Sequence, residues 1–234
     1  MSGGTGAFSM FPSNPLFIGL FLYPLYFFLY ALALYALGIV VTLRANIGYA
    51  PWDAFHAGLS QKAGISFGTA SIIVGIFVGA LVMVLGEKIG LGSILNMVLI
   101  GIIIDIIMFF GLIPLSQNYV AGIAMLLVGL LIIAVGTYFY IKSAFGAGPR
   151  DSLMVVLNRK TRIPVGVCRI MVELTVTIAG WALGGMVGIG TVISAVAIGF
   201  FVQLVFAVLR FKPASVQHET LRQTYENLRR CASK

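Results

Sequence analysis

Long apolar runs alternate with short polar segments along most of the chain. About 20 apolar residues in a helix cross the roughly 30 Å hydrocarbon core of a bilayer, and the runs come close to or exceed that length. They do not alternate apolar and polar residues as the strands of a membrane barrel would. We therefore predict an all-α integral membrane protein with about six transmembrane helices, at residues 16–43, 67–85, 93–113, 119–141, 164–183 and 191–209.

The composition agrees with this class of protein. Hydrophobic residues make up 60% of the chain, charged residues 9%, and the mean hydropathy is +1.05. The formal net charge of +8 is explained by lysine and arginine at the ends of the apolar runs and in the tail, so we expect no nucleic-acid partner. If the N-terminus is cytoplasmic, Arg44 and Lys62 are the only basic residues of the loops and tail that lie on the outer side of the membrane. Basic residues gather on the cytoplasmic side, so this arrangement predicts that both termini face the cytoplasm of a bacterial inner membrane.

The chain repeats itself at an offset of 98 residues. Gapless matches pair Gly38 with Gly136, Pro51 with Pro149, Asp53 with Asp151, Leu59 with Leu157, Gly68 with Gly166, and Gly101 with Gly199. Each copy carries three predicted spans, and an odd number makes the second copy enter the membrane from the opposite side. We thus expect a flexible start (1–15), a first repeat (16–115), a second, inverted repeat (116–209) and a basic cytoplasmic tail (210–234) that forms an amphipathic surface helix.

Two matching segments interrupt the apolar pattern between the first two spans of each repeat. They read Gly-Tyr-Ala-Pro-Trp-Asp (48–53) and Gly-Ala-Gly-Pro-Arg-Asp (146–151), and each precedes a short polar helix, at 54–63 and 152–160. Proline followed by aspartate is typical of the first turn of a helix. Such helix starts build substrate sites in inverted-repeat transporters, although they also occur in surface loops that cap amphipathic helices. The candidate binding residues here are Gly48, Pro51, Asp53, Gly148, Pro149, Arg150 and Asp151.

Four further polar residues lie within the predicted spans. Asp105 and its repeat partner Gln203 are both expected at mid-span, where a charge is costly and marks either a functional site or a hydrogen bond between helices. Arg169 and Glu173 are four residues apart on one helical face and can pair, although Arg169 is also close enough to the start of its span to reach the interface. We add all four to the candidate substrate-binding residues.

No catalytic constellation or metal-binding motif is present in the sequence. His56 follows Asp53 by three residues and could act as a base, although a lone histidine on such a helix is more often incidental. The Cys168 and Cys231 thiols fall in a span and in the tail, so no disulfide is expected. We therefore expect neither an enzyme nor a bound cofactor.

The two Pro-x-Asp segments, together with residues 66–70 (SFGTA) and 187–191 (VGIGT), resemble those of the YczE/YyaS/YitT group of bacterial inner-membrane proteins. The similarity covers about residues 30–205 and is greatest to the YczE branch, although the first repeat reads Gly-Leu-Gly-Ser (90–93) where the second reads Gly-Ile-Gly-Thr. This resemblance implies a polytopic bacterial membrane protein. It implies no substrate and no site residues.

These observations favour a small secondary transporter or exporter of a polar or ionic solute that works by alternating access. The alternative is a membrane-embedded regulatory or assembly protein without transport activity. The expected partners are a small molecule or ion and the lipid bilayer, and a homodimer is also compatible with the sequence.

Overall fold

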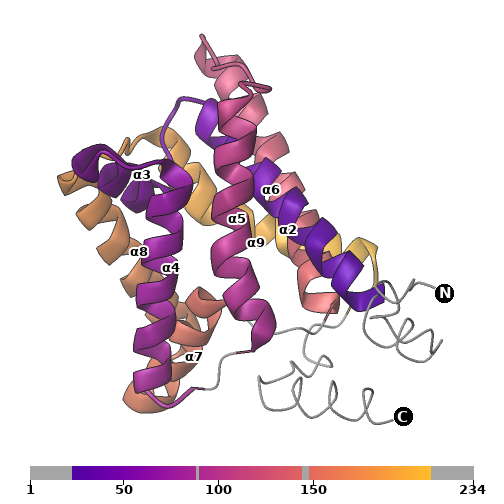
Figure 1. Cartoon of the computed structure of the whole chain (residues 1–234), viewed down its shortest axis with the longest axis vertical. Coiled ribbons are helices and arrows are strands. Elements are labelled where there is room, and N and C mark those ends of the chain that lie inside the picture. The colour runs from indigo at the N-terminus through magenta and orange to yellow at the C-terminus, as the bar shows by residue number, and fades with distance from the viewer. Residues whose placement is uncertain (1–22, 88–89, 144–147, 212–234) are drawn as a thin grey trace, which may run out of the picture.

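The computed structural model describes residues 23–87, 90–143 and 148–211 (Figure 1). The described chain is all-helical. Its helices are α2 (Tyr23–Arg44), α3 (Pro51–Ala63), α4 (Phe67–Val84), α5 (Leu91–Phe109), α6 (Tyr119–Lys142), α7 (Pro149–Thr161), α8 (Val165–Ala182) and α9 (Ile189–Val208). All except α3 and α7 are long and apolar enough to cross a membrane. The predicted all-α membrane protein with six spans is thereby confirmed.

The helix boundaries follow local sequence signals. Pro51 and Pro149 begin α3 and α7, where the missing proline N–H would have no helical partner in any case. Gly64 ends α3 in a left-handed conformation, and Arg162, its counterpart at the 98-residue offset, ends α7 in the same way. The predicted flexible start and nearly all of the predicted tail helix lie outside the described residues.

The end of α5 differs from the sequence expectation by four residues, and α3 and α7 each begin three residues earlier than predicted. Helix α5 ends at Phe109 because Gly111 adopts a positive φ of 61°, so the helix stops before the proline at 114 that was expected to end it. Asp105 therefore lies four residues from the end of its helix rather than at the centre of a span.

Helices α2 and α6 pack against each other along their length on one side of the molecule, as Figure 1 shows. Glycines permit this close approach: a Cβ at Gly38 would lie 2.9 Å from the Gly129 carbonyl oxygen, and one at Gly136 would lie 3.0 Å from the Tyr35 nitrogen. Helix α5 packs on α2, and α9 packs on α6. Rings near the start of α2, the end of α6 and the end of α9 touch, so these three helix ends lie at the same end of the bundle.

The two short helices lie at opposite ends of α4, as Figure 1 shows. Helix α3 packs on α8, where Gly180 lies directly against the backbone of Ala54 and Phe55. Helix α7 packs on α4, and Arg159 of α7 forms a 2.7 Å ion pair with Glu87, just beyond the end of α4. Each short helix therefore packs on a span from the other half of the chain.

Candidate functional site

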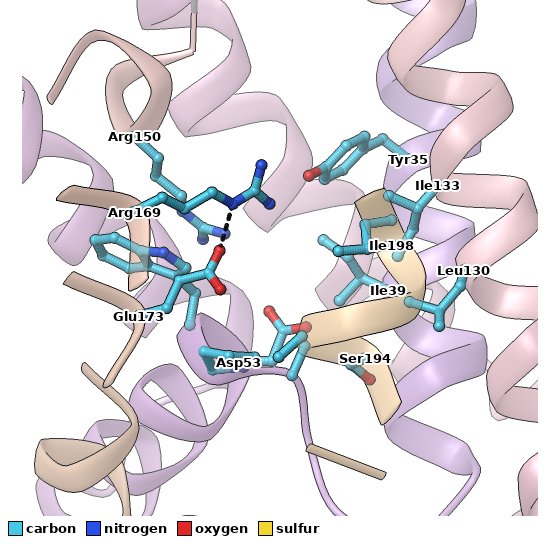
Figure 2. Close-up of a pocket in the computed structure, with 14 residues that line it drawn as sticks. Tyr35, Ile39, Asp53, Leu130, Ile133, Arg150, Arg169, Glu173, Ser194 and Ile198 are labelled. Atoms are coloured by element: carbon cyan, nitrogen blue, oxygen red, sulfur yellow. Dashed lines mark hydrogen bonds and ion pairs between the residues drawn. The ribbon is translucent and has the colours of Figure 1, made fainter. Parts of the chain in front are cut away.

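A pocket of about 100 Å³ lies at mid-depth in the bundle (Figure 2). Side chains from six helices line it: Tyr35, Ile39, Pro51, Trp52, Asp53, Leu130, Ile133, Arg150, Arg169, Glu173, Ser194, Ala195 and Ile198. Several of these sit near the middle of their spans, since Glu173 is eight residues from the start of α8 and Ile198 is nine from the start of α9. The pocket is therefore far from both ends of the bundle.

The starts of α3 and α7 meet at this pocket. Arg150, the second residue of α7, places its guanidinium 4.7 Å from the centre of the Trp52 ring, and Trp52 is the second residue of α3. Neither helix has a side-chain cap at its N-terminus. The unpaired N–H groups of a helix start carry partial positive charge, so two such ends contribute positive potential near the pocket.

Asp53 and His56 lie side by side beneath this contact. Both are buried, with 5% and 1% of their surfaces exposed. Burial raises the pKa of Asp53 to about 6 despite the opposing effect of Arg150. Burial and Arg150 both lower the pKa of His56, which is therefore neutral. Because arginine has only donors, the 3.3 Å contact from Arg150 makes His56 Nε2 an acceptor and leaves the imidazole proton on Nδ1, 3.8 Å from Asp53 Oδ1.

Arg169 and Glu173 form an ion pair at the edge of the pocket. Arg169 Nε donates to Glu173 Oε1 over 2.8 Å, and 51% of the Arg169 side chain is exposed, against 19% for Glu173. Figure 2 shows this pair and Arg150 on one side of the pocket, with Tyr35, Ile39, Leu130 and Ile133 facing them. The pocket thus has a charged side and an apolar side.

The structure brings together five of the sequence candidates, Pro51, Asp53, Arg150, Arg169 and Glu173. Sequence reasoning did not single out the apolar wall, because its isoleucines and leucine are indistinguishable from ordinary span residues. It also did not single out Ser194, whose hydroxyl is buried and has no hydrogen-bond partner in the described part of the chain. A polar residue at that depth, whose repeat counterpart Asn96 is also polar, was the available signal.

The remaining candidates lie elsewhere. Gly48, with a φ of +117°, packs against Gly188 at the junction of α8 and α9, where a Cβ would lie 2.7 Å from backbone. Pro149 begins α7 and Gly148 precedes it, next to the pocket but not lining it, and Gln203 is exposed on α9. The side chain of Asp151 lies outside the described residues.

Asp105 joins α5 to the start of α4. Its carboxylate accepts hydrogen bonds from the Gly68 N–H (2.8 Å) and the Ser66 hydroxyl (2.5 Å). Next to this contact Gly68 and Gly101 touch, since a Cβ on Gly68 would lie 2.0 Å from the Gly101 carbonyl oxygen. We call Ser66, Gly68, Gly101 and Asp105 the α4–α5 joint.

The equivalent residues of the second half, Pro164, Gly166, Gly199 and Gln203, are separated. A Cβ on Gly166 or on Gly199 would have no atom within 4 Å, and α8 and α9 do not pack closely, whereas α4 and α5 do. We call this second set the α8–α9 joint. The two helix pairs, which match in sequence at the 98-residue offset, are therefore packed differently, and we call the α4–α5 joint closed and the α8–α9 joint open.

Within the described ranges, no group of three or more His, Cys, Asp or Glu side chains could hold a metal ion. The polar side chains that line the pocket are those of two arginines, two acidic residues, a serine and a tyrosine, and His56 lies behind them in contact with Arg150.

Comparison with known proteins identifies relatives over most of the chain. A family described as a family of unknown function (DUF6198) matches residues 22–207. The uncharacterized membrane protein YczE of Bacillus subtilis is 37% identical over 82% of this chain and 86% of its own length. An uncharacterized protein of Haemophilus influenzae is 30% identical over 79% and 84% of the two chains, and YyaS of Bacillus subtilis is 26% identical over 68% and 80%.

No solved structure matches the chain. The resemblance seen in the sequence to the group that contains YczE and YyaS is confirmed by these relatives. The chain belongs to the family DUF6198 and is a relative of the membrane protein YczE.

Proposed function

We propose that this protein is a secondary transporter that moves a small polar or ionic solute through the mid-depth pocket by alternating access. The observation that carries the proposal is the difference between the two equivalent joints. The α4–α5 joint is closed and the α8–α9 joint is open, and they lie toward opposite ends of the bundle. A pocket between two such joints is open to one side of a membrane and closed to the other.

The proposal requires the two halves to be inverted repeats, and several contacts support this arrangement. Adding 98 to the bounds of α3 and α4 gives those of α7 and α8. The Ser60 hydroxyl donates to the Ile65 carbonyl, and the Asn158 amide donates to the Ile163 carbonyl at the same offset. Trp52 and Arg150 are themselves counterparts and touch each other, as expected of residues beside a two-fold axis.

The open joint lies toward the end of the bundle that holds α7. The start of α8 and the end of α9 lie there, and so do the basic residues Lys142, Arg159, Lys160, Arg162 and Arg210. By the positive-inside rule this end faces the cytoplasm. The pocket is then open inward, and both ends of the described chain face the cytoplasm.

The outward-open state would exchange the two joints. Helix α8 would close on α9 through Gly166 and Gly199, while α4 and α5 would separate. The residues two helical turns deeper than Gly68 and Gly166 also suit this exchange. In the closed pair Gly75 lies against Met97, and in the open pair their counterparts are Glu173 and Ala195, so the small and the large side chain have changed places. Closure would bring Glu173 toward Ala195 and cover the pocket.

Cysteine accessibility tests the proposal without knowledge of the solute. In a Cys168→Ser, Cys231→Ser background, Ala195→Cys places one reporter thiol in the pocket, and Ser143→Cys marks the α7 end as a control. A membrane-impermeant maleimide is applied to right-side-out and to inverted vesicles. We expect the pocket thiol to react from both faces and the Ser143→Cys thiol from the cytoplasmic face alone.

The variant Gly166→Ala then separates a transporter from a scaffold. Its added methyl group would block closure of the α8–α9 joint, so the pocket thiol should react from the cytoplasmic face only. If the Ala195→Cys thiol reacts from one face both with and without Gly166→Ala, the protein is static, as the regulatory or assembly alternative requires.

A further inference from the structure

The charges of the pocket do not cancel, and the imbalance indicates the class of solute. Of its four charged side chains, Arg169 and Glu173 are paired at 2.8 Å and neutralise each other. Arg150 and Asp53 remain. Their state of charge therefore sets the net charge that a solute meets.

Arg150 is a fixed positive charge, because a guanidinium stays protonated in proteins. Its partners are the Trp52 ring and the neutral His56, and neither carries a negative charge. Among the described side chains, no carboxylate lies within ion-pair distance of it. The uncapped starts of α3 and α7 add partial positive charge on the same side of the pocket.

Among the described side chains near Arg150, Asp53 is the carboxyl group that can change this balance. The described titratable and charged groups around it are His56 on its own helix, Tyr35 of α2, Arg150 of α7, and Arg169 and Glu173 of α8, while α4 and α9 present none. When Asp53 is ionised it offsets the charge of Arg150. When Asp53 is protonated, the pocket carries a net charge of about +1. A bound monovalent anion would neutralise this charge.

The opposite wall defines the rest of the solute. Ile39, Leu130, Ile133 and Ile198 form an apolar surface beside Tyr35, facing the charged side across a cavity of about 100 Å³ (Figure 2). A hydrated inorganic ion makes poor use of such a wall, whereas each CH₂ group of a short alkyl chain is stabilised by leaving water and packing there.

We propose that the pocket binds a small organic monoanion, with its carboxylate or similar group on Arg150 and its short chain against Ile39 and Ile133, and that Asp53 takes up a proton from water when the anion binds. This inference rests on the proposed function in so far as the pocket is a solute site. On this basis the transporter carries an anion together with a proton. A protonated Asp53 carries no charge and has an O–H that can donate a hydrogen bond, so it no longer repels the incoming anion.

Isothermal titration of the purified full chain tests this proposal with sodium butyrate as the probe. Butylammonium, with the same chain and opposite charge, and chloride, with the same charge and no chain, are the matched ligands. We expect butyrate to bind most tightly, and its affinity to fall about tenfold for each pH unit above pH 7, because binding requires a protonated Asp53.

Variants assign the roles. Asp53→Asn, which imitates the protonated carboxyl, should bind butyrate with no pH dependence between pH 6.5 and pH 8.5. Arg150→Gln should weaken binding at least tenfold and Arg150→Lys less, while Arg159→Gln, on the same helix outside the pocket, should have no effect. If an Arg150 variant fails to fold, the Asp53→Asn comparison and the three wild-type ligands still decide.

Three results would overturn the proposal: no butyrate binding at pH 6, binding of butylammonium or chloride as tight as that of butyrate, or a pH dependence that survives in Asp53→Asn. The thiol accessibility described above needs no ligand. A protein that alternates between faces without binding butyrate would therefore refute the anion inference alone, and one that binds butyrate without alternating would refute the transport proposal alone.

Discussion

Gly68 and Gly166 occupy the second position of α4 and of α8 and are repeat counterparts, so the same substitution at each provides a matched comparison. We predict that Gly166→Ala leaves the folded protein intact and holds it in the inward-open state. We predict that Gly68→Ala destabilises this state and shifts the population toward the opposite one.

The geometry gives the expected magnitudes. A Cβ on Gly68 would lie 2.0 Å from the Gly101 carbonyl oxygen and 2.5 Å from Asp105 Cγ, and the first of these neighbours is backbone that cannot move aside alone. Overpacking of this kind costs about 1–3 kcal/mol, and displacing Asp105 weakens its bond from the Gly68 N–H, worth about 1.5–3 kcal/mol for a charged acceptor. A Cβ on Gly166 meets nothing within 4 Å, and alanine favours a helix over glycine by up to about 1 kcal/mol.

Thermal unfolding in detergent measures the first part of this prediction. At roughly 2–4 °C per kcal/mol for a chain of this size, Gly68→Ala should lower Tm by several degrees, and Gly166→Ala should leave Tm unchanged or slightly higher. The Ala195→Cys thiol measures the second part. It should react from the cytoplasmic face only in Gly166→Ala, and more from the periplasmic face in Gly68→Ala than in the parent.

The reasoning would be refuted by equal Tm values for the two variants, since the joints would then not differ as the structure describes. It would also be refuted if Gly166→Ala reacted from both faces as the parent does. That result would mean that α8 and α9 do not need to approach each other for the pocket to change sides.

Three further predictions concern single residues and orientation. Asp105→Leu should lower Tm, because the Gly68 N–H and the Ser66 hydroxyl lose their acceptor. Gln203→Leu at the open joint should leave Tm unchanged, and an equal decrease in Tm for both variants would contradict this reasoning. Because the pKa of Asp53 is raised to about 6 in the folded state, stability should fall as pH rises from about 4 to about 6, and Asp53→Asn should remove that dependence from the unfolding curves. Reporter fusions after Leu115 should read periplasmic and those after Lys160 cytoplasmic, and the reverse result would exclude the proposed orientation.

The sequence by itself determined the class of protein, the spans and the duplicated starts of α3 and α7. The physical reason is that each of these features is local. A span must be apolar over the thickness of the bilayer and must satisfy its own backbone hydrogen bonds, so its ends can be identified without knowledge of its neighbours. Proline at the first position of a helix is likewise a local signal, and Pro51 and Pro149 begin α3 and α7.

Only the tertiary structure decided which helices touch. It placed Arg150 on Trp52, set an apolar wall from α2 and α6 opposite Arg169 and Glu173, and closed one joint while leaving its counterpart open. Lipid solvates every apolar helix face about equally, so hydrophobicity cannot assign partners within a membrane. Partners are chosen instead by shape and by a few polar contacts, such as the bond from Gly68 to Asp105, between residues distant in the chain.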